Sequence, residues 1–206
     1  MTLIQTRFDE WQKQLWKEFA EEVNGNIINR GKYNPDTLVY KYKLWTVVLE
    51  EMIYMVSGTS SGELVTRLKI PIVNKQGLHF KVHKEDLFKK VFKLFGSQDI
   101  QVGAPAMDKR FIIEGNNEKV IRKILTNESI KELMLLMPNA YFRLRTDEEK
   151  NGDDFPVGVD LLEIYVSGKI GQLGLLVAFH NVLTRTCDIL TELDQSFGID
   201  PEVRLL

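Results

Sequence analysis

The sequence predicts an α+β fold with largely antiparallel sheet, in the order sheet, helix, sheet, helix, and with a long C-terminal helix. Segments with a period of two come in consecutive runs, which is typical of strands joined by hairpins. Segments with helical spacing separate these runs irregularly, which disfavours a doubly wound α/β fold. The order leaves open an arrangement of two sheet-plus-helix halves, although no residue-level repeat marks a duplication.

The length of 206 residues favours a single α+β domain over 1–206. Its first element is an N-terminal amphipathic helix within 1–25, because apolar residues recur at spacings of three and four. These residues are Phe8, Trp11, Leu15 and Phe19. Asn24-Gly25 is a typical end for such a helix, and the apolar stripe is expected to cover the core.

A β-meander is predicted over 45–82, where the period becomes two. Its three strands, expected to pair consecutively, cover 45–56, 64–72 and 78–82. In the first strand Glu51 interrupts an apolar face, so a helix remains an alternative there. In the second, Leu68 and its alternating neighbours form an apolar face opposite a polar one.

The rest of the chain alternates between helical and extended patterns. Asn residues at 116 and 117 and Thr126 are the expected caps of two central helices. The predicted elements are a helix over 85–95, strands over 100–103 and 110–114, helices over 118–125 and from 126 to before Pro138, strands over 140–144 and 161–166, and a helix over 170–197.

Composition excludes several classes of protein. The chain has 27 basic and 29 acidic residues, a formal net charge of -2 and 44% apolar residues, which disfavours disordered and strongly nucleic-acid-seeking proteins. Cys187 is the one cysteine, so neither an intramolecular disulfide nor a zinc site of several cysteines can form. The first ten residues lack a secretory pattern and the longest apolar run, 173–179, is short, so we expect a cytoplasmic protein without a membrane span.

Motifs for common chemistries are missing from the sequence. Phosphate loops, dinucleotide fingerprints and a nucleophile elbow match nowhere, so no cofactor is predicted. His79 and His83 would lie about 13 Å apart in one strand. His180 and Cys187 would lie about 10.5 Å apart on one helix, so neither pair predicts a metal site.

A carboxylate-dependent enzyme stays open, because Asp99, Asp108 and Asp160 could meet in space without leaving a sequence signature. The simpler interpretation is that Asp99 and Asp108 cap turns or pair with Arg67 or Arg110. No catalytic residue is therefore assigned, and the sequence favours a non-catalytic protein.

Charge is segregated along the chain. Residues 67–93 hold basic side chains at 67, 69, 75, 81, 84, 89, 90 and 93 against acidic ones at 85 and 86. Residues 147–163 hold acidic side chains at 147, 148, 149, 153, 154, 160 and 163 against one basic at 150. Two such blocks would favour head-to-tail self-association or an acidic partner protein.

A basic patch on the sheet is the candidate binding site. Arg67 and Lys69 share the polar face of one predicted strand, while His79 and Lys81 share the polar face of the next. If these strands pair as a hairpin, the four side chains form one cationic patch. An ordinary solvated sheet face is the plainer interpretation, and the net charge makes nucleic acid an unfavourable partner.

Short motifs resemble those of a bacterial family of cytoplasmic proteins of unknown function. They are Thr66-Arg67, Gln98-Asp99-Ile100-x-x-Gly103, Asp108-x-x-Phe111-Ile112-Ile113-x-Gly115-Asn116 and Gly168-x-Ile170. The resemblance covers about residues 45–200. It implies a bacterial origin and an α+β domain, and it carries over no catalytic or binding residue.

The leading functional hypothesis is a non-catalytic binding or assembly module that uses the basic sheet face. A carrier of a small apolar ligand, held in a pocket between sheet and helix, is the main alternative. The carboxylate-dependent enzyme is the third.

Overall fold

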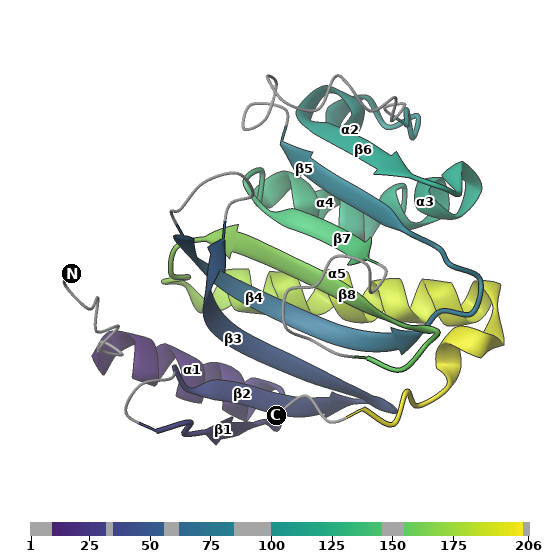
Figure 1. Ribbon diagram of the computed structural model, residues 1–206. Coiled ribbons are helices and arrows are strands. Elements are labelled where there is room, and N and C mark those ends of the chain that lie inside the picture. The colour runs from purple at the N-terminus through teal and green to yellow at the C-terminus, as the bar shows by residue number, and fades with distance from the viewer. Residues whose placement is uncertain (1–9, 32–34, 56–61, 85–99, 146–154, 204–206) are drawn as a thin grey trace.

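The computed structural model describes residues 10–31, 35–55, 62–84, 100–145 and 155–203. The α+β prediction is confirmed: within these ranges eight strands form one antiparallel sheet in the order β1-β2-β3-β4-β8-β7-β5-β6 (Figure 1). The strands are β1 (Asn26–Ile28), β2 (Thr37–Tyr42), β3 (Trp45–Met55), β4 (Gly62–Val73), β5 (Phe80–Lys84), β6 (Phe111–Gly115), β7 (Tyr141–Arg145) and β8 (Val159–Ser167).

Helices cover one face of this sheet, with α5 running behind its central strands (Figure 1). The helices are α1 (Glu10–Glu22), α2 (Pro105–Arg110), α3 (Glu118–Leu125), α4 (Glu128–Leu136) and α5 (Leu173–Leu193), followed by a short 3-10 turn, η2 (Gln195–Gly198). The opposite face of the sheet, called the polar face below, carries charged side chains that include Glu50, Arg67, Lys69, Arg143 and Glu163.

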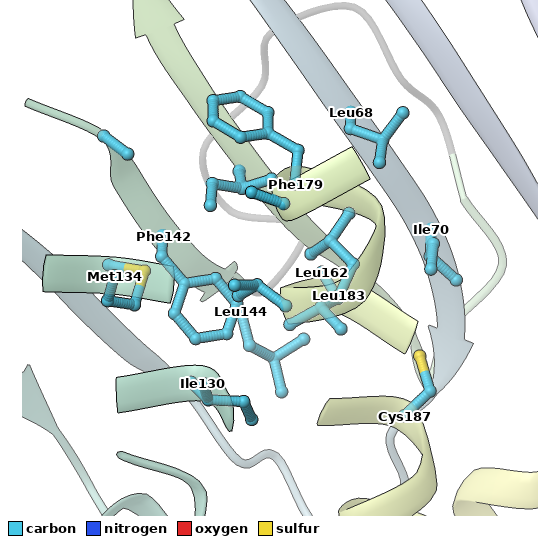
Figure 2. Close-up of a cluster of buried hydrophobic side chains, with 14 of the residues drawn as sticks. Leu68, Ile70, Ile130, Met134, Phe142, Leu144, Leu162, Phe179, Leu183 and Cys187 are labelled. Carbon is cyan, nitrogen blue, oxygen red and sulfur yellow. The ribbon is translucent and has the colours of Figure 1, made fainter. Parts of the chain in front are cut away.

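The core lies between the sheet and the helices. Alternate residues of the strands point toward the helices because successive side chains of a strand face opposite sides. Figure 2 shows the result, in which β4, β7 and β8 meet α4 and α5 across a layer of buried apolar side chains. They include Leu68, Ile70, Ile130, Met134, Phe142, Leu144, Leu162, Phe179, Leu183 and Cys187.

The N-terminal helix is confirmed as α1, and it ends before Asn24, whose φ of 51° is left-handed as at many helix ends. Trp16 and Phe19 are buried in the core, whereas Trp11 keeps 48% of its surface exposed. The Glu51 that interrupts the apolar face of β3 accepts a hydrogen bond from buried Gln12 of α1. This contact explains how a carboxylate fits on the helix-covered face.

The predicted meander is only half right. Strands β3 and β4 pair antiparallel, as expected. The third segment, now β5, does not pair with β4; it pairs with β6 and β7, and β8 takes the place beside β4. Strand β8 is the better partner because it matches β4 over nine residue pairs, with Leu162 opposite Ile70 on the helix-covered face and Glu163 opposite Lys69 on the polar face.

Three boundaries also differ from the predictions. Residues 101–103 form no strand, and α2 follows them directly. Asn127 caps α4, and not Thr126, whose hydroxyl donates back to the carbonyl of Arg122. The final helix begins at Leu173 and ends at Leu193, where the turn η2 replaces its last predicted residues. The predicted helix over 85–95, the 147–154 part of the acidic block and Asp99 lie outside the described residues.

Pairing of β4 with β8 joins the two runs of strands into one continuous sheet. Behind it, α5 is the one helix of the described ranges that is long and apolar enough to cross a bilayer. Its most apolar stretch is 56% buried inside the fold, as expected for the central helix of a core.

Candidate functional site

The four residues of the predicted basic patch lie in three different settings. Arg67 and Lys69 are on the polar face of β4, but only 5% and 3% of their surfaces are exposed. Lys81 is half-buried on β5, and His79 is exposed just before β5 begins. Because β8 and β7 separate β4 from β5, the predicted hairpin does not exist. The cations therefore do not form the solvated patch expected from that hairpin.

Arg67 and Lys69 instead belong to an ion-pair cluster on the polar face. The cluster consists of Glu50, Arg67, Lys69, Arg143, Arg145 and Glu163, all buried. Arg67 Nε donates to Glu50 Oε1 at 2.9 Å, and Lys69 Nζ lies 3.0 Å from the same oxygen.

Glu163 is the centre of the cluster. Its exposed fraction is 0%, and it is held by arginines from two strands. Arg67 Nη1 lies 3.0 Å from Glu163 Oε2, while Arg143 Nε and Arg145 Nε lie 2.5 and 3.3 Å from Oε1. The charge-assisted hydrogen bonds from Arg67 and Arg143, together with the ion pair to Arg145, compensate for the removal of the carboxylate from water.

Strand register produces this arrangement. Lys69, Glu163, Arg143 and Lys81 lie directly opposite one another on β4, β8, β7 and β5. Glu163 therefore lies between two cations, Lys69 and Arg143, and oppositely charged side chains in such positions attract each other. The basic and acidic blocks of the sequence thus meet, in part, inside one molecule.

The cluster favours the charged forms of Glu163 and Arg143. Burial by itself would raise the pKa of Glu163, but the positive charges of Arg143, Arg67 and Arg145 bring that pKa below its ordinary value. Burial likewise opposes the charge of Arg143, and the carboxylate of Glu163 outweighs it, so the pKa of Arg143 rises.

A stack of rings runs beside the cluster on the same face. The rings of His83, Tyr141, Tyr165 and Tyr54 follow one another with centroid distances of 5.8, 4.9 and 5.7 Å, and the planes of Tyr141 and Tyr165 differ by 3°. We call these four residues the tyrosine–histidine ladder. The guanidinium of Arg143 lies 5.4 Å from the ring centroid of Tyr165, which links the ladder to the ion-pair cluster.

Three partly solvent-accessible side chains lie at the margin of these two groups. Tyr54, Tyr141 and Lys81 are half-buried there, whereas Tyr165 and His83 are buried. Burial raises the pKa of Tyr141, so its hydroxyl stays protonated at neutral pH and can donate a hydrogen bond. This margin offers rigid aromatic rings and a cationic side chain to a ligand.

Two residues of the motifs, Asp108 and Asn116, make hydrogen bonds to the backbone of neighbouring loops. The Asp108 carboxylate accepts hydrogen bonds from the backbone amides of Val102 and Gly103 at 2.8 and 3.0 Å. This confirms the turn-capping interpretation of Asp108. Asn116 bridges the loop before β5, because it accepts from the amide of His79 and donates to the carbonyl of Gly77.

The remaining candidates are also in structural settings. Asp160, on the helix-covered face, accepts a hydrogen bond from Asn74. Cys187 is fully buried, and burial raises the pKa of its thiol, which makes it an inert core residue. Over the described ranges, His, Cys, Asp and Glu side chains form no group that could hold a metal ion.

Comparisons with protein-family models, with curated proteins and with solved structures give no match for this chain. The resemblance to a bacterial family and the cytoplasmic location therefore stay predictions, and the site is interpreted from its own geometry.

Sequence reasoning missed most of the ion-pair cluster. Arg143 and Arg145 alternate with apolar residues in β7, and Glu163 does so in β8. That alternation placed all three on a polar face, and it was the available signal. The order of strands in the sheet, which brings them to Arg67, was the missing information.

Proposed function

We propose that the chain is a non-catalytic binding module that contacts an acidic partner protein through the polar face of its sheet. The observation that carries this proposal is a group of three half-buried side chains, Tyr54, Tyr141 and Lys81. The two tyrosines stack on buried Tyr165, next to the ion-pair cluster. Tyrosine and arginine are enriched at protein interfaces, since they give large contact areas and directional hydrogen bonds.

Rigidity supports a binding role for this margin. Tyr141 is fixed between His83 and Tyr165, so it loses little conformational entropy when a partner binds. Lys81 lies opposite Arg143 on the next strand and adds positive charge at the solvent side. A negatively charged partner is the chemistry that such a surface favours.

The carrier alternative gains no support from the helix-covered face. Large side chains such as Phe142, Phe179 and Leu162 fill the layer between sheet and helices (Figure 2). The hypothesis of a carboxylate-dependent enzyme is weakened at Asp108, because both oxygens of this carboxylate accept backbone hydrogen bonds.

Affinity capture from a lysate of the source organism, followed by measurement of the purified pair, tests the proposal. We expect an acidic protein to bind the wild type, and Lys81→Glu or Tyr141→Ala to weaken it by at least about tenfold. Lys109→Glu, an exposed charge reversal on α2, is the matched control and should bind as the wild type does. A partner that binds all four proteins equally would contradict the proposed surface.

Self-association is the second form of the same proposal. Sedimentation at about 0.05 M and about 0.5 M salt should show oligomers that dissociate as salt screens the charges. A monomer under both conditions, together with no captured partner, would overturn the binding role.

A further inference from the structure

Polar contacts join strand β2 to helix α5. Tyr40 and Tyr42 are both on the helix-covered face of β2, because they are two residues apart. The Tyr40 hydroxyl lies 2.9 Å from His180 Nδ1 on α5. Two turns further along α5, Asp188 accepts a hydrogen bond from the Tyr42 hydroxyl at 2.9 Å and pairs with Lys43 at 2.6 Å.

The protonation states of the first pair follow from burial. Tyr40 is 3% exposed, and burial raises the pKa of its phenol, so the hydroxyl keeps its proton. In the neutral imidazole with its hydrogen on Nε2, Nδ1 can accept a hydrogen bond from the Tyr40 hydroxyl. The rings of Tyr40 and Tyr42 lie 5.6 and 5.8 Å from the imidazole and enclose it on two sides.

We propose that the contact between His180 and Tyr40 is a pH-sensitive latch, which holds β2 against α5 and is released when the imidazole takes up a proton. Once Nδ1 carries a hydrogen, it can no longer accept from Tyr40. The phenol oxygen can accept from Nδ1–H instead, but the Tyr40 hydrogen then needs another acceptor at a side chain that is only 3% exposed, which is costly. The new charge on the imidazole also sits in a partly buried position, away from water.

Neighbouring charges do not cancel this effect. The groups that face His180 are Glu22 from α1, Tyr40 and Tyr42 from β2, and, further along, Asp188 with Lys43. Burial lowers the pKa of His180, and the charge of Glu22 raises it only in part, so the net shift is downward. Asp188 is already engaged by Tyr42 and Lys43.

Release would affect one end of the molecule. Strand β1 pairs only with β2 in the described sheet, and α1 packs against β1, β2 and α5. Loosening of β2 from α5 therefore exposes the unit formed by α1, β1 and β2, while β7 and β8 stay covered by α4 and α5 (Figure 1).

Hydrogen exchange of the full chain between about pH 7.5 and about pH 5.5 tests the latch, after correction for intrinsic rates. We expect amides of β2 and α1 to lose protection at the lower pH, while those of β7 keep it. The open-to-closed ratio should rise on acidification, by at most about tenfold for each unit by which the pKa of His180 is lower in the closed state. Equal loss of protection in β2 and β7, or no loss at all, would overturn the latch.

Two variants separate His180 from the other histidines. His180→Asn offers an oxygen to the Tyr40 hydroxyl and cannot titrate, so its β2 protection should not change with pH. His79→Asn replaces an exposed histidine and should respond as the wild type does. A wild-type response in His180→Asn contradicts the proposal.

A titration of the wild type by NMR keeps the test valid even if His180→Asn does not fold. The imidazole signals of His180 should titrate below the ordinary histidine pKa of about 6.5, and the β2 amide shifts should follow the His180 titration. If β2 follows another histidine, or if His180 titrates at or above that ordinary value, the latch is wrong.

Discussion

Glu163 is the residue on which the polar face depends most. It is fully buried and shares its two oxygens among Arg67, Arg143 and Arg145. A buried carboxylate stabilises the fold only when its cationic partners are present, and each buried cation likewise needs the carboxylate.

Glu163→Gln should lower the free energy of unfolding by about 3–5 kcal/mol, because three buried guanidinium groups lose their shared counter-charge. Urea denaturation at neutral pH measures it. The control is Glu118→Gln, which removes an exposed carboxylate paired with Arg122 and should cost less than about 1 kcal/mol. Equal effects of the two substitutions would contradict the assigned role of the cluster.

Acid should act on the same carboxylate. Because the pKa of Glu163 is lower in the folded chain than in the unfolded one, its contribution to stability is fully present above the unfolded pKa of about 4.3. That contribution is lost as the pH falls through the folded pKa. Wild type and Glu163→Gln should therefore approach each other in stability in strong acid, and a difference that stays constant with pH would argue against this linkage.

The sequence predicted correctly which face of the sheet Arg67 and Lys69 lie on, but it did not predict that both are buried. The period of two placed Arg67 and Lys69 on the polar face of a strand, where they lie. A period reports which side a residue faces and carries no information about what lies over that side. The burial of both cations and their pairing with Glu50 and Glu163 therefore could not be predicted.

At the scale of elements, close backbone approaches fix the ends of β5 and β6. A Cβ at Gly115 would lie 2.5 Å from the carbonyl oxygen of His79 and 2.5 Å from Ile121 Cδ1. Gly174, in the first turn of α5, has no atom within 4 Å of the corresponding position.

Alanine substitutions at these two glycines should have opposite signs. Gly115→Ala should destabilise the chain by about 1–3 kcal/mol or more, since backbone must move to admit the methyl group. Gly174→Ala should stabilise it by about 0.5–1 kcal/mol, because alanine is the better helix former. Thermal melts of both variants beside the wild type give the comparison, and a stabilised Gly115→Ala would contradict the described packing.

Element types were more predictable than strand partners. Ten of the strands and helices predicted from local patterns are present, such as α3 over residues 118–125 with Asn117 as its cap. Local signals of this kind depend on residues close together in sequence. The pairing of β4 with β8 joins residues about a hundred positions apart, so a local pattern cannot reveal it.

The whole molecule is expected to unfold as one unit, because β4 and β8 join both runs of strands and α5 packs on both. Phe142→Ala should lower the stability by about 3–5 kcal/mol, as it empties a large site in the core. All three tryptophans precede residue 46. Their fluorescence and the far-UV circular dichroism should therefore shift to the same denaturant midpoint in this variant, and two separate midpoints would indicate independent halves.

The two edge strands of the sheet, β1 and β6, are poor templates for pairing with another chain. Strand β1 has only three residues, and the amide of Ile100 already donates to the carbonyl of Ile113 on the outer side of β6. An exposed ladder of free amides and carbonyls is what allows molecules to add to one another strand by strand. Both features reduce the backbone that is available for growth strand by strand, so concentrated solutions of the folded protein are expected to stay clear.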